Sequence, residues 1–259
     1  MKTALVTGAS SGIGAEFARQ LAAKQNNLVL IARSEDKLKE LAEQLQSKHG
    51  IQTYVIAQDL TEPQAVATIF EKIQHQGLRI DLLVNNAGFG DYGQFSDRPL
   101  EKQLGMIQLN VNVLVELTGL FLPAMKQRGD GGIINISSIA GFQPFPKMSV
   151  YAATKAFVLN FTEALWAENR DTGVKILAVC PGPTESQFWK AAEFPVSLME
   201  KNQNGMKLIS NKVVVAEALK ALERKQPNVV TGGFLNQFIV NLPRFVPRDL
   251  LVRQLAKMF

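Results

Sequence analysis

The chain has 259 residues, of which 46% are hydrophobic and 20% charged, a composition that builds a packed core and excludes disorder as the main state. Its formal net charge of +5, from 28 lysines and arginines against 23 acids, is spread along the chain, so no nucleic-acid partner is expected. The single cysteine, Cys180, excludes an intrachain disulfide, and with only two histidines we expect no metal site.

The sequence shows no pattern of export or of a membrane span. Residues 1–8 run directly into an apolar strand pattern, without the basic, apolar and small-residue regions of a secretory signal. The most apolar stretch, residues 111–125, contains Asn112, Glu116 and Pro123, which a bilayer-spanning helix disfavours. Together with cysteine use that fits a reducing compartment, these features predict a cytoplasmic protein.

Short apolar runs rich in β-branched residues alternate with amphipathic segments along the chain. The runs are typical of strands buried on both faces, and the segments are typical of helices. This alternation predicts a Rossmann-type α/β fold, a doubly wound parallel sheet of about seven strands with helices on both faces, in a single domain over residues 1–259. The expected strands are Ala4–Val6, Leu28–Ile31, Thr53–Ile56, Leu82–Val84, Ile133–Ile136, Ile176–Val179 and Val229–Val230. The expected helices are Ala15–Lys24, Asp36–Lys48, Gln64–Gln74, Leu100–Lys126, Ala152–Asn169 and Lys212–Arg224.

Two regions depart from this alternation. Residues 182–211, after the sixth strand, carry no clear strand pattern. Irregular insertions after late strands of an open α/β sheet lie near the ligand crevice, so this segment is a candidate substrate lid. The tail, residues 234–259, is apolar and basic and is interrupted by two prolines.

A glycine-rich turn follows the first strand. Glycines let the backbone turn tightly and approach a pyrophosphate, which binds the free N–H groups at a helix N-terminus. Such a turn can also be purely structural, but its place between a strand and a helix favours dinucleotide binding. The residues of this turn are Gly8, Ser10, Ser11, Gly12, Ile13 and Gly14.

The end of the second strand indicates which dinucleotide is bound. An acid that binds the ribose is expected about 20 residues after the glycine turn, but Arg33 and Ser34 stand there instead. An arginine can pair with a 2′-phosphate, so NADP(H) is favoured over NAD(H); the alternative is a solvated surface arginine. Asp59, which precedes Leu60 after the third strand, either accepts from an adenine amino group or caps the next helix.

Three residues indicate acid–base chemistry. Tyr151 and Lys155 are four residues apart in a predicted helix, so their side chains lie on one face. A neighbouring ammonium stabilises a phenolate, and we therefore expect Lys155 to lower the pKa of Tyr151. Ser138, after the fifth strand, could donate to a carbonyl oxygen held beside the tyrosine. On its own, a tyrosine and a lysine at this spacing are also common as an ordinary surface pair.

In combination, these motifs resemble those of the short-chain dehydrogenase/reductase family over residues 3–186. Residues 7–14 resemble its TGxxxGxG loop, residues 85–88 its NNAG segment, and residues 181–182 its PG turn. The resemblance implies a catalytic tetrad of Asn110, Ser138, Tyr151 and Lys155. In that scheme Tyr151 exchanges a proton with the substrate and Ser138 orients the carbonyl. Lys155 binds the nicotinamide ribose, and Asn110 holds a water that relays protons.

The resemblance also implies a set of cofactor contacts, with two departures from the family pattern. Ser11 stands where many NADPH-using relatives have a basic residue, so the preference for NADP(H) depends on Arg33. Ser186 replaces a common threonine and keeps its hydroxyl. The implied contacts are Gly8, Ser10, Ser11, Gly12, Ile13, Gly14, Arg33, Ser34, Asp59, Leu60, Asn86, Ala87, Gly88, Tyr151, Lys155, Pro181, Gly182, Thr184 and Ser186.

The substrate side of the sequence is apolar. The lid and residues 142–148 carry large apolar side chains, which either bind an apolar carbonyl substrate or pack the lid onto the core. Residues 233–236 do not resemble the Val-Asp-Gly-Gly ending of 3-oxoacyl carrier-protein reductases, and the tail is more similar to branches that include hydroxysteroid and fatty-acyl enzymes. The apolar residues are Phe142, Phe145, Met148, Phe188, Trp189, Phe194, Val196, Leu198, Met199 and Met206.

The tail has the pattern of a basic amphipathic helix. Four cations, Arg244, Arg248, Arg253 and Lys257, stand against one acid, Asp249, among apolar residues. Such a helix could lie on a membrane surface or pack across a subunit interface.

We therefore expect an NADP(H)-dependent oxidoreductase that acts on an apolar ketone, aldehyde or secondary alcohol. Association through the long helices predicts a homodimer or homotetramer. Two alternatives use the same fold: a catalytically silent NADP(H)-sensing regulator, and a membrane-surface scaffold that works through the tail. A regulator would usually have lost Tyr151 or Lys155, and this chain has both.

Overall fold

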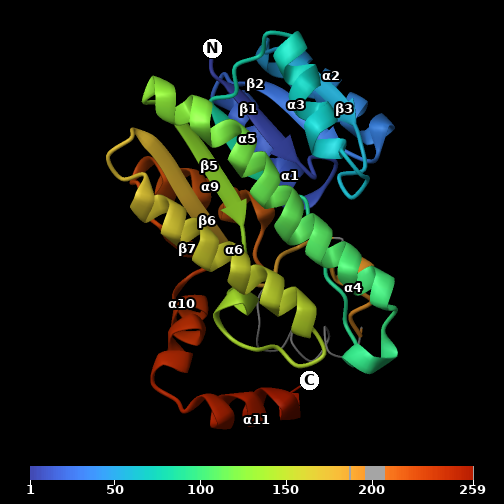
Figure 1. Cartoon of the computed structure of the whole chain (residues 1–259), viewed down its shortest axis with the longest axis vertical. Helices are drawn as coiled ribbons and strands as arrows, with labels where there is room; N and C mark the ends of the chain where they lie inside the picture. The colour runs from blue at the N-terminus through green and yellow to red at the C-terminus, as the bar shows by residue number, and fades with distance from the viewer. Residues whose placement is uncertain (187, 196–207, 259) are drawn as a thin grey trace.

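A seven-stranded parallel sheet forms the centre of the protein (Figure 1). The computed structural model describes residues 1–186, 188–195 and 208–258. The strands lie in the order β3-β2-β1-β4-β5-β6-β7, so the chain winds from the middle to one edge and then from the middle to the other. The strands are β1 (Thr3–Thr7), β2 (Asn27–Ala32), β3 (Thr53–Ala57), β4 (Leu82–Asn85), β5 (Gly131–Ile136), β6 (Val174–Pro181) and β7 (Asn228–Thr231).

The central strands bury side chains on both faces of the sheet. In β1, Leu5 packs in one core while Ala4 and Val6 pack in the other, because successive side chains of a strand alternate. In β5, Ile133 and Ile134 are divided between the two cores in the same way. The uninterrupted apolar runs of the sequence therefore fill two cores rather than one.

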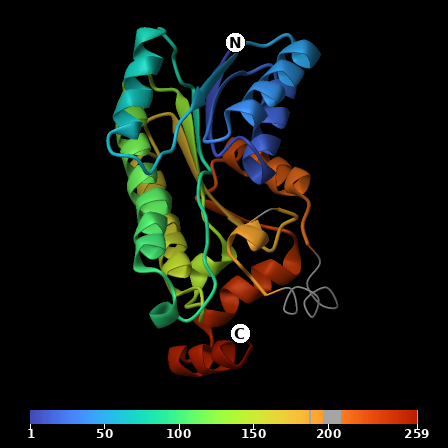
Figure 2. The same ribbon diagram turned by 90° about the vertical axis from the view of Figure 1, so that its right-hand side faces the viewer.

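Helices cover both faces of the sheet (Figure 2). α1, α2 and α9 supply the core on one face, and α3 and α5 supply the core on the other, where α6 also packs against β6. The helices on the sheet are α1 (Gly12–Ala23), α2 (Glu35–His49), α3 (Ala65–His75), α4 (Leu100–Ile107), α5 (Val113–Arg128), α6 (Ser149–Glu168) and α9 (Asn211–Glu223). The remaining helices are α7 (Phe188–Ala191), α10 (Phe234–Asn241) and α11 (Arg248–Met258), with short 3₁₀ turns at Phe95–Asp97, Ile139–Phe142 and Leu242–Arg244.

The predicted α/β fold is confirmed, and every expected strand lies within an observed one. One helix differs from its prediction. The segment expected as a single α-helix over Leu100–Lys126 consists of α4, a π-helical segment η2 (Gln108–Asn112), and α5. A π-segment adds one residue to a helical turn and has no signature in the hydrophobic period, so the pattern alone could not predict it.

The continuous helical stretch Leu100–Arg128 is long and apolar enough to cross a membrane, by length and composition alone. In the structure it runs along the sheet (Figure 1), and Val113, Leu117 and Phe121 are buried in the core on that face. The apolar residues on the inner side of this helical stretch are thus explained by its packing on the sheet.

The carboxyl ends of the strands meet at one end of the molecule. β1 lies between β2 and β4, so the order of the strands reverses there, and the loops that follow β1 and β4 leave a crevice between them. The predicted basic helix of the tail is found as α11. It follows α10, and both lie beyond the carboxyl ends of the strands (Figure 1).

Candidate active site

A cavity of about 650 Å³ lies at the carboxyl ends of the strands. Of the residues predicted for the site, all but Gly14 and Asn110 line this cavity. The loops that follow the first six strands, β1 to β6, contribute to it, so residues far apart in the sequence meet in one place. The predicted residues that line it are Gly8, Ser10, Ser11, Gly12, Ile13, Arg33, Ser34, Asp59, Leu60, Asn86, Ala87, Gly88, Ser138, Tyr151, Lys155, Pro181, Gly182, Thr184 and Ser186.

The glycine turn packs too closely for larger residues. A Cβ on Gly14 would lie 2.3 Å from the carbonyl oxygen of Gly8, so Gly14 shapes the turn although it does not line the cavity. Gly8 and Gly12 have φ angles of +65° and +56°, the left-handed region that favours glycine. The first N–H groups of α1 therefore stand at the cavity wall, where a phosphate can bind them.

Asn86 ties the glycine turn to the end of β4. Its Nδ2 donates to the carbonyl oxygen of Thr7 at 2.9 Å, and the Thr7 Oγ1 accepts from the backbone N–H groups of Asn86 and Ala87, both at 3.0 Å. The sequence analysis did not assign this role to Thr7. Thr7 is the first residue of the TGxxxGxG pattern, and its hydroxyl stands at the end of a central strand; these are its sequence signals.

Arg33, Ser34 and Asp59 stand at one end of the cavity. The Arg33 side chain is 80% exposed, and its Nη1 lies 3.7 Å from an Asp59 carboxylate oxygen. Burial opposes ionisation of Asp59, but hydrogen bonds from Thr61 and the charge of Arg33 outweigh it and lower the pKa of Asp59. The Asp59 carboxylate accepts from the backbone N–H of Thr61 at 2.9 Å, within the turn that precedes α3. The N-cap of α3 is Gln64, so the alternative that Asp59 caps the next helix is wrong. An exposed guanidinium beside the Ser34 hydroxyl suits a phosphate group.

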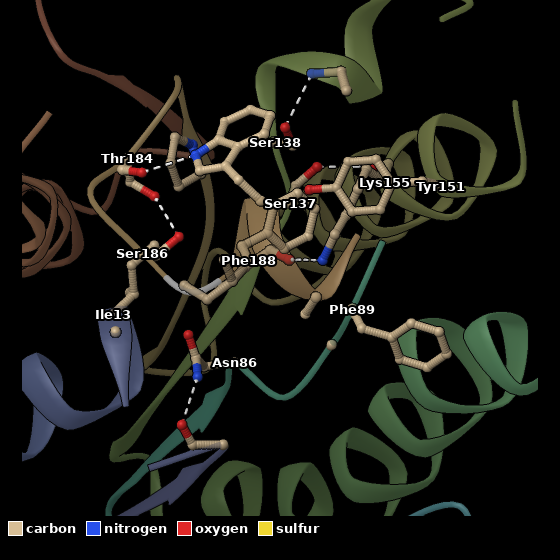
Figure 3. A pocket seen from close by; sticks show the side chains of 18 of the residues that line it. Ile13, Asn86, Phe89, Ser137, Ser138, Tyr151, Lys155, Thr184, Ser186 and Phe188 are labelled. Carbon is tan, nitrogen blue, oxygen red and sulfur yellow. Dashed lines mark hydrogen bonds between the residues drawn. The ribbon is translucent and has the colours of Figure 1, made fainter. Parts of the chain in front are cut away.

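Ser138, Tyr151 and Lys155 gather around one part of the cavity, while Thr184 and Ser186 lie across from them (Figure 3). Tyr151 and Lys155 extend from α6, and Lys155 Nζ lies 5.7 Å from the centre of the Tyr151 ring. Lys155 Nζ donates to the carbonyl oxygen of Ile136 at 2.9 Å, which fixes the ammonium beside the end of β5. The predicted shared helix face is thus confirmed.

The pKa of Tyr151 shifts in the direction opposite to the sequence expectation. Burial raises the pKa of Tyr151 to about 12, and a hydrogen bond with the Ser138 side chain only partly opposes this rise. Burial also lowers the pKa of Lys155 to about 8. Burial removes water from the charged form of each group. This cost outweighs the stabilisation that we expected the Lys155 ammonium to give a Tyr151 phenolate. At neutral pH the tyrosine is a phenol, and the lysine is still mostly an ammonium.

Asn110 lies behind the cavity, within the π-helical segment. Its Nδ2 donates to the Phe89 carbonyl at 3.0 Å and to Thr154 Oγ1 at 3.1 Å, and its Oδ1 accepts from the Phe89 N–H at 3.1 Å. These bonds join the loop after β4 to α6, the helix that carries Tyr151. The observed contacts of Asn110 thus hold these two segments together. The water-holding role implied by the family resemblance remains a prediction.

Aromatic side chains of the lid lie against Tyr151. The centre of the Phe188 ring is 5.2 Å from that of Tyr151, and Trp189 Nε1 donates to the Thr184 carbonyl at 3.0 Å. A Cβ on Gly90 would lie 2.5 Å from the tip of the Phe188 ring, so a larger residue there would displace the ring from its present position. Of the predicted apolar residues, Val196, Leu198, Met199 and Met206 lie outside the described residues.

An ionic cluster fastens the lid to α4, and the sequence analysis missed it. The Asp91 carboxylate is fully buried and accepts from Arg98 Nη2 at 2.6 Å and from Gln103 Nε2 at 2.6 Å. Lys102 Nζ lies 2.7 Å from Asp91 and 2.6 Å from Glu193, which follows α7. The three nearby charges, Asp91, Arg98 and Lys102, were visible in the sequence, but only the fold brings Glu193 to them.

The tail contributes to the cavity wall. Ile239 of α10, Leu242 after it, and Leu251 and Leu255 of α11 line the same space as Tyr151. Leu251 and Leu255 are four residues apart, so both project from the inner side of α11, where they are buried. Apolar groups from the lid and from the tail therefore enclose one part of the cavity that Tyr151 lines.

The fold and the site together define a dinucleotide-binding α/β protein with an acid–base pair beside the binding crevice. A family model described as short chain dehydrogenase matches residues 2–194. The chain belongs to the short-chain dehydrogenase family.

The comparisons also give individual relatives. The very-long-chain 3-oxoacyl-CoA reductase of Anas platyrhynchos is 39% identical over 184 residues, which cover 69% of this chain and 58% of that protein. A short-chain dehydrogenase from Sphingobium yanoikuyae, solved in complex with NADPH, is 34% identical with a TM-score of 0.81, covering 89% of this chain and 87% of that chain. A 7β-hydroxysteroid dehydrogenase structure is 27% identical with a TM-score of 0.87, covering 98% of this chain and 96% of that chain. The chain thus spans little more than half the length of the curated reductase.

We predict that Asp91→Asn destabilises the protein by about 3 kcal/mol at pH 7, because Arg98 and Lys102 lose their buried counter-charge. Arg98 and Lys102 hold the pKa of Asp91 below its usual value despite its burial. Their stabilisation is therefore complete above the unfolded pKa of about 4 and is lost as pH falls through the lower folded pKa. Urea unfolding at several pH values measures both effects.

The matched control is Asp97→Asn, an exposed acid on the same segment, for which we expect a change below about 0.5 kcal/mol. Equal stability of Asp91→Asn and the wild-type chain at neutral pH would show that the ionic cluster does not hold the lid.

Proposed function

We propose that the protein is an NADP(H)-dependent reductase of apolar ketones or aldehydes. The observation that carries this proposal is the buried pair Tyr151 and Lys155 facing Ser138 in the cavity beside the glycine turn. Bound NADPH would supply a hydride to the carbonyl carbon. The glycine turn, which a Cβ at Gly14 would fill, and the exposed Arg33 fit the phosphate groups of that cofactor.

The side chains divide the remaining work. Ser138 Oγ accepts from the Ala140 N–H at 3.1 Å, and its side chain hydrogen-bonds with Tyr151 in the free protein. The Ser138 hydroxyl would donate to the substrate carbonyl once that oxygen lies between the two side chains. The Tyr151 hydroxyl donates its proton to the carbonyl oxygen as negative charge develops there. Tyr151 is protonated in the free protein at neutral pH, as the acid role in reduction requires.

Lys155 stabilises the tyrosinate left by proton transfer. Its ammonium lies beside the Tyr151 ring and is held by the carbonyl of Ile136. In a cavity shielded from water, an ammonium at this distance stabilises a phenolate more strongly than it would in solution. Lys155 therefore contributes most to catalysis after Tyr151 has donated its proton, when negative charge has formed on the tyrosine oxygen.

The substrate class is proposed from the walls of the cavity. Phe188, Trp189 and Phe194 enclose it from the lid, and Leu251 and Leu255 enclose it from the tail. Such walls exclude water and bind apolar groups without strong discrimination among them. The names of two relatives, a very-long-chain 3-oxoacyl-CoA reductase and a 7β-hydroxysteroid dehydrogenase, support a bulky apolar substrate.

Replacing the proton donor tests the reaction. We expect Tyr151→Phe to lower kcat for reduction of apolar ketones by about 10²–10⁴-fold, because general acid catalysis is lost while the cavity is kept. The affinity for NADPH should change less than about twofold, since the ring remains. NADPH oxidation and NADPH fluorescence titration measure the two quantities.

Tyr54→Phe is the control, because Tyr54 lies on β3 and hydrogen-bonds Gln52 at 2.9 Å. Tight NADPH binding by the wild-type chain with no turnover of any ketone or aldehyde would favour the sensing regulator instead.

The choice of cofactor is tested at the end of β2. Arg33→Ala should lower kcat/KM for NADPH by about 10–100-fold and leave that for NADH nearly unchanged, because only the 2′-phosphate needs the guanidinium. The control is Arg19→Ala, an exposed arginine on α1 that pairs with Glu16. Equal losses with both cofactors would refute the proposed phosphate contact.

We further propose that the protein forms a homo-oligomer through α5 and α6. Leu120 and Phe157 are 36% and 41% exposed on these helices, and Phe157 stacks on Phe161 with ring centres 5.7 Å apart. Both helices lie on the same face of the sheet (Figure 1). A paired copy would cover these apolar side chains.

Light scattering tests this interface. Phe157→Glu should reduce the assembly to smaller species, because it places two charges in the contact, while Phe95→Glu at another exposed site should not. An unchanged molar mass for Phe157→Glu would contradict the proposed interface.

A further inference from the structure

The outer side of the tail exposes large apolar side chains next to the cavity. Phe234 and Phe238 of α10 are 82% and 55% exposed, and Phe245, between α10 and α11, is 84% exposed. Leu235 and Leu242 are exposed on the same side of α10, since positions three and four apart share a helix face. We call Phe234, Leu235, Phe238, Leu242 and Phe245, with Leu250 of α11, the tail face.

Cations surround the tail face. Arg244, Arg248, Arg253 and Lys257 are all exposed, and Asp249 is the one acid among residues 234–258. Across the described residues, the structure records no ion pair for these four cations. Their charge is therefore available to an anionic surface rather than used within the fold.

The helices that carry the tail face lie at one end of the molecule. α10 and α11 lie beyond the carboxyl ends of the strands, and α11 is the outermost element there (Figures 1 and 2). Among the helices and strands of the described residues, none extends past it in either view. A flat surface could thus approach this end without contacting the helices that cover the sheet.

The inner sides of the same two helices line the cavity. Leu242 takes part in both surfaces: it is 38% exposed and also lines the cavity, whereas Leu251 and Leu255 face inward only. One layer of helix therefore separates the proposed substrate space from the tail face. Apolar substrate that reached this face would be one helix layer away from the cavity that Tyr151 also lines.

We propose that the tail face docks on an anionic lipid bilayer and that apolar substrate enters the cavity from the lipid. Phenylalanine and leucine between arginines are the composition of helices that lie in the membrane interface. Docking itself is independent of the reductase activity; only the delivery of substrate rests on the proposed function.

Charge favours lipid over a second copy of the chain. A two-fold contact through this face would bring the cations of one copy toward those of the other, because such an interface pairs a patch with itself. Anionic headgroups would instead neutralise them. The tail face differs in this respect from the exposed side of α5 and α6, where Leu120 and Phe157 lie without such a cluster of arginines.

Cosedimentation with vesicles tests the docking. The full chain is mixed with vesicles of phosphatidylcholine alone or with about one-third phosphatidylserine. We expect binding to the anionic vesicles, and a loss of roughly tenfold or more in vesicle affinity for two variants. One is Phe234→Ser/Phe238→Ser/Phe245→Ser, and the other is Arg244→Gln/Arg248→Gln/Arg253→Gln.

The control is Phe95→Ser/Val213→Ser, which removes exposed apolar side chains away from the tail and should bind as the wild-type chain does. Failure of the wild-type chain to bind anionic vesicles, or equal binding by all variants, would overturn the docking. So would light scattering in which the phenylalanine variant alone dissociates an oligomer while vesicle binding is unchanged.

Kinetics then test the delivery of substrate. For a long-chain methyl ketone dissolved in the vesicles, the phenylalanine variant should show an increased KM, whereas for cyclohexanone in solution its KM and kcat should equal those of the wild-type chain. Equal KM for the ketone in vesicles would overturn delivery while docking stands. Vesicle binding without turnover of either ketone would refute the proposed reductase and leave the docking intact.

Discussion

Burial of Tyr151 and Lys155 side by side is the constraint on which the rest of the site depends. Each group would keep its ordinary pKa in water, and burial moves the two in opposite directions, to about 12 and about 8. At neutral pH the site therefore holds a protonated phenol next to an ammonium, which can stabilise the tyrosinate once the proton has left. The fold has to keep both groups dry and fixed.

Backbone contacts around α6 supply that fixation. Lys155 Nζ is held by the Ile136 carbonyl, and the Lys155 carbonyl accepts from Ser137 Oγ at 2.7 Å. Gly141 approaches so closely that a Cβ there would lie 2.7 Å from the same carbonyl oxygen. Asn110 holds the other side of α6 through Thr154. Apolar groups of the lid and the tail line the same cavity, so the walls proposed to bind substrate also contribute to the burial that shifts the two pKa values.

The fold and the members of the site followed from local rules, whereas the contacts between distant segments did not. Alternating apolar runs predicted the sheet, and the spacing of Tyr151 and Lys155 predicted their shared face. The π-segment at Asn110 could not be predicted, because one extra residue hardly changes an apolar pattern over a long helix. The pairing of Lys102 with Glu193 needed the folded lid. The direction of the Tyr151 shift was predicted wrongly because spacing reveals a neighbouring charge but not how much water is lost.

An NMR titration of Lys155 in the purified wild-type chain, with isotope-labelled lysine and assignment by Lys155→Arg, tests the central claim most directly. We predict that the Lys155 amino group loses its proton near pH 8, at a lower pH than the exposed Lys39, whose pKa is raised by its hydrogen bond with Glu35. Titration of Lys155 together with the exposed lysines would contradict it, because burial would then not control the charges at the site.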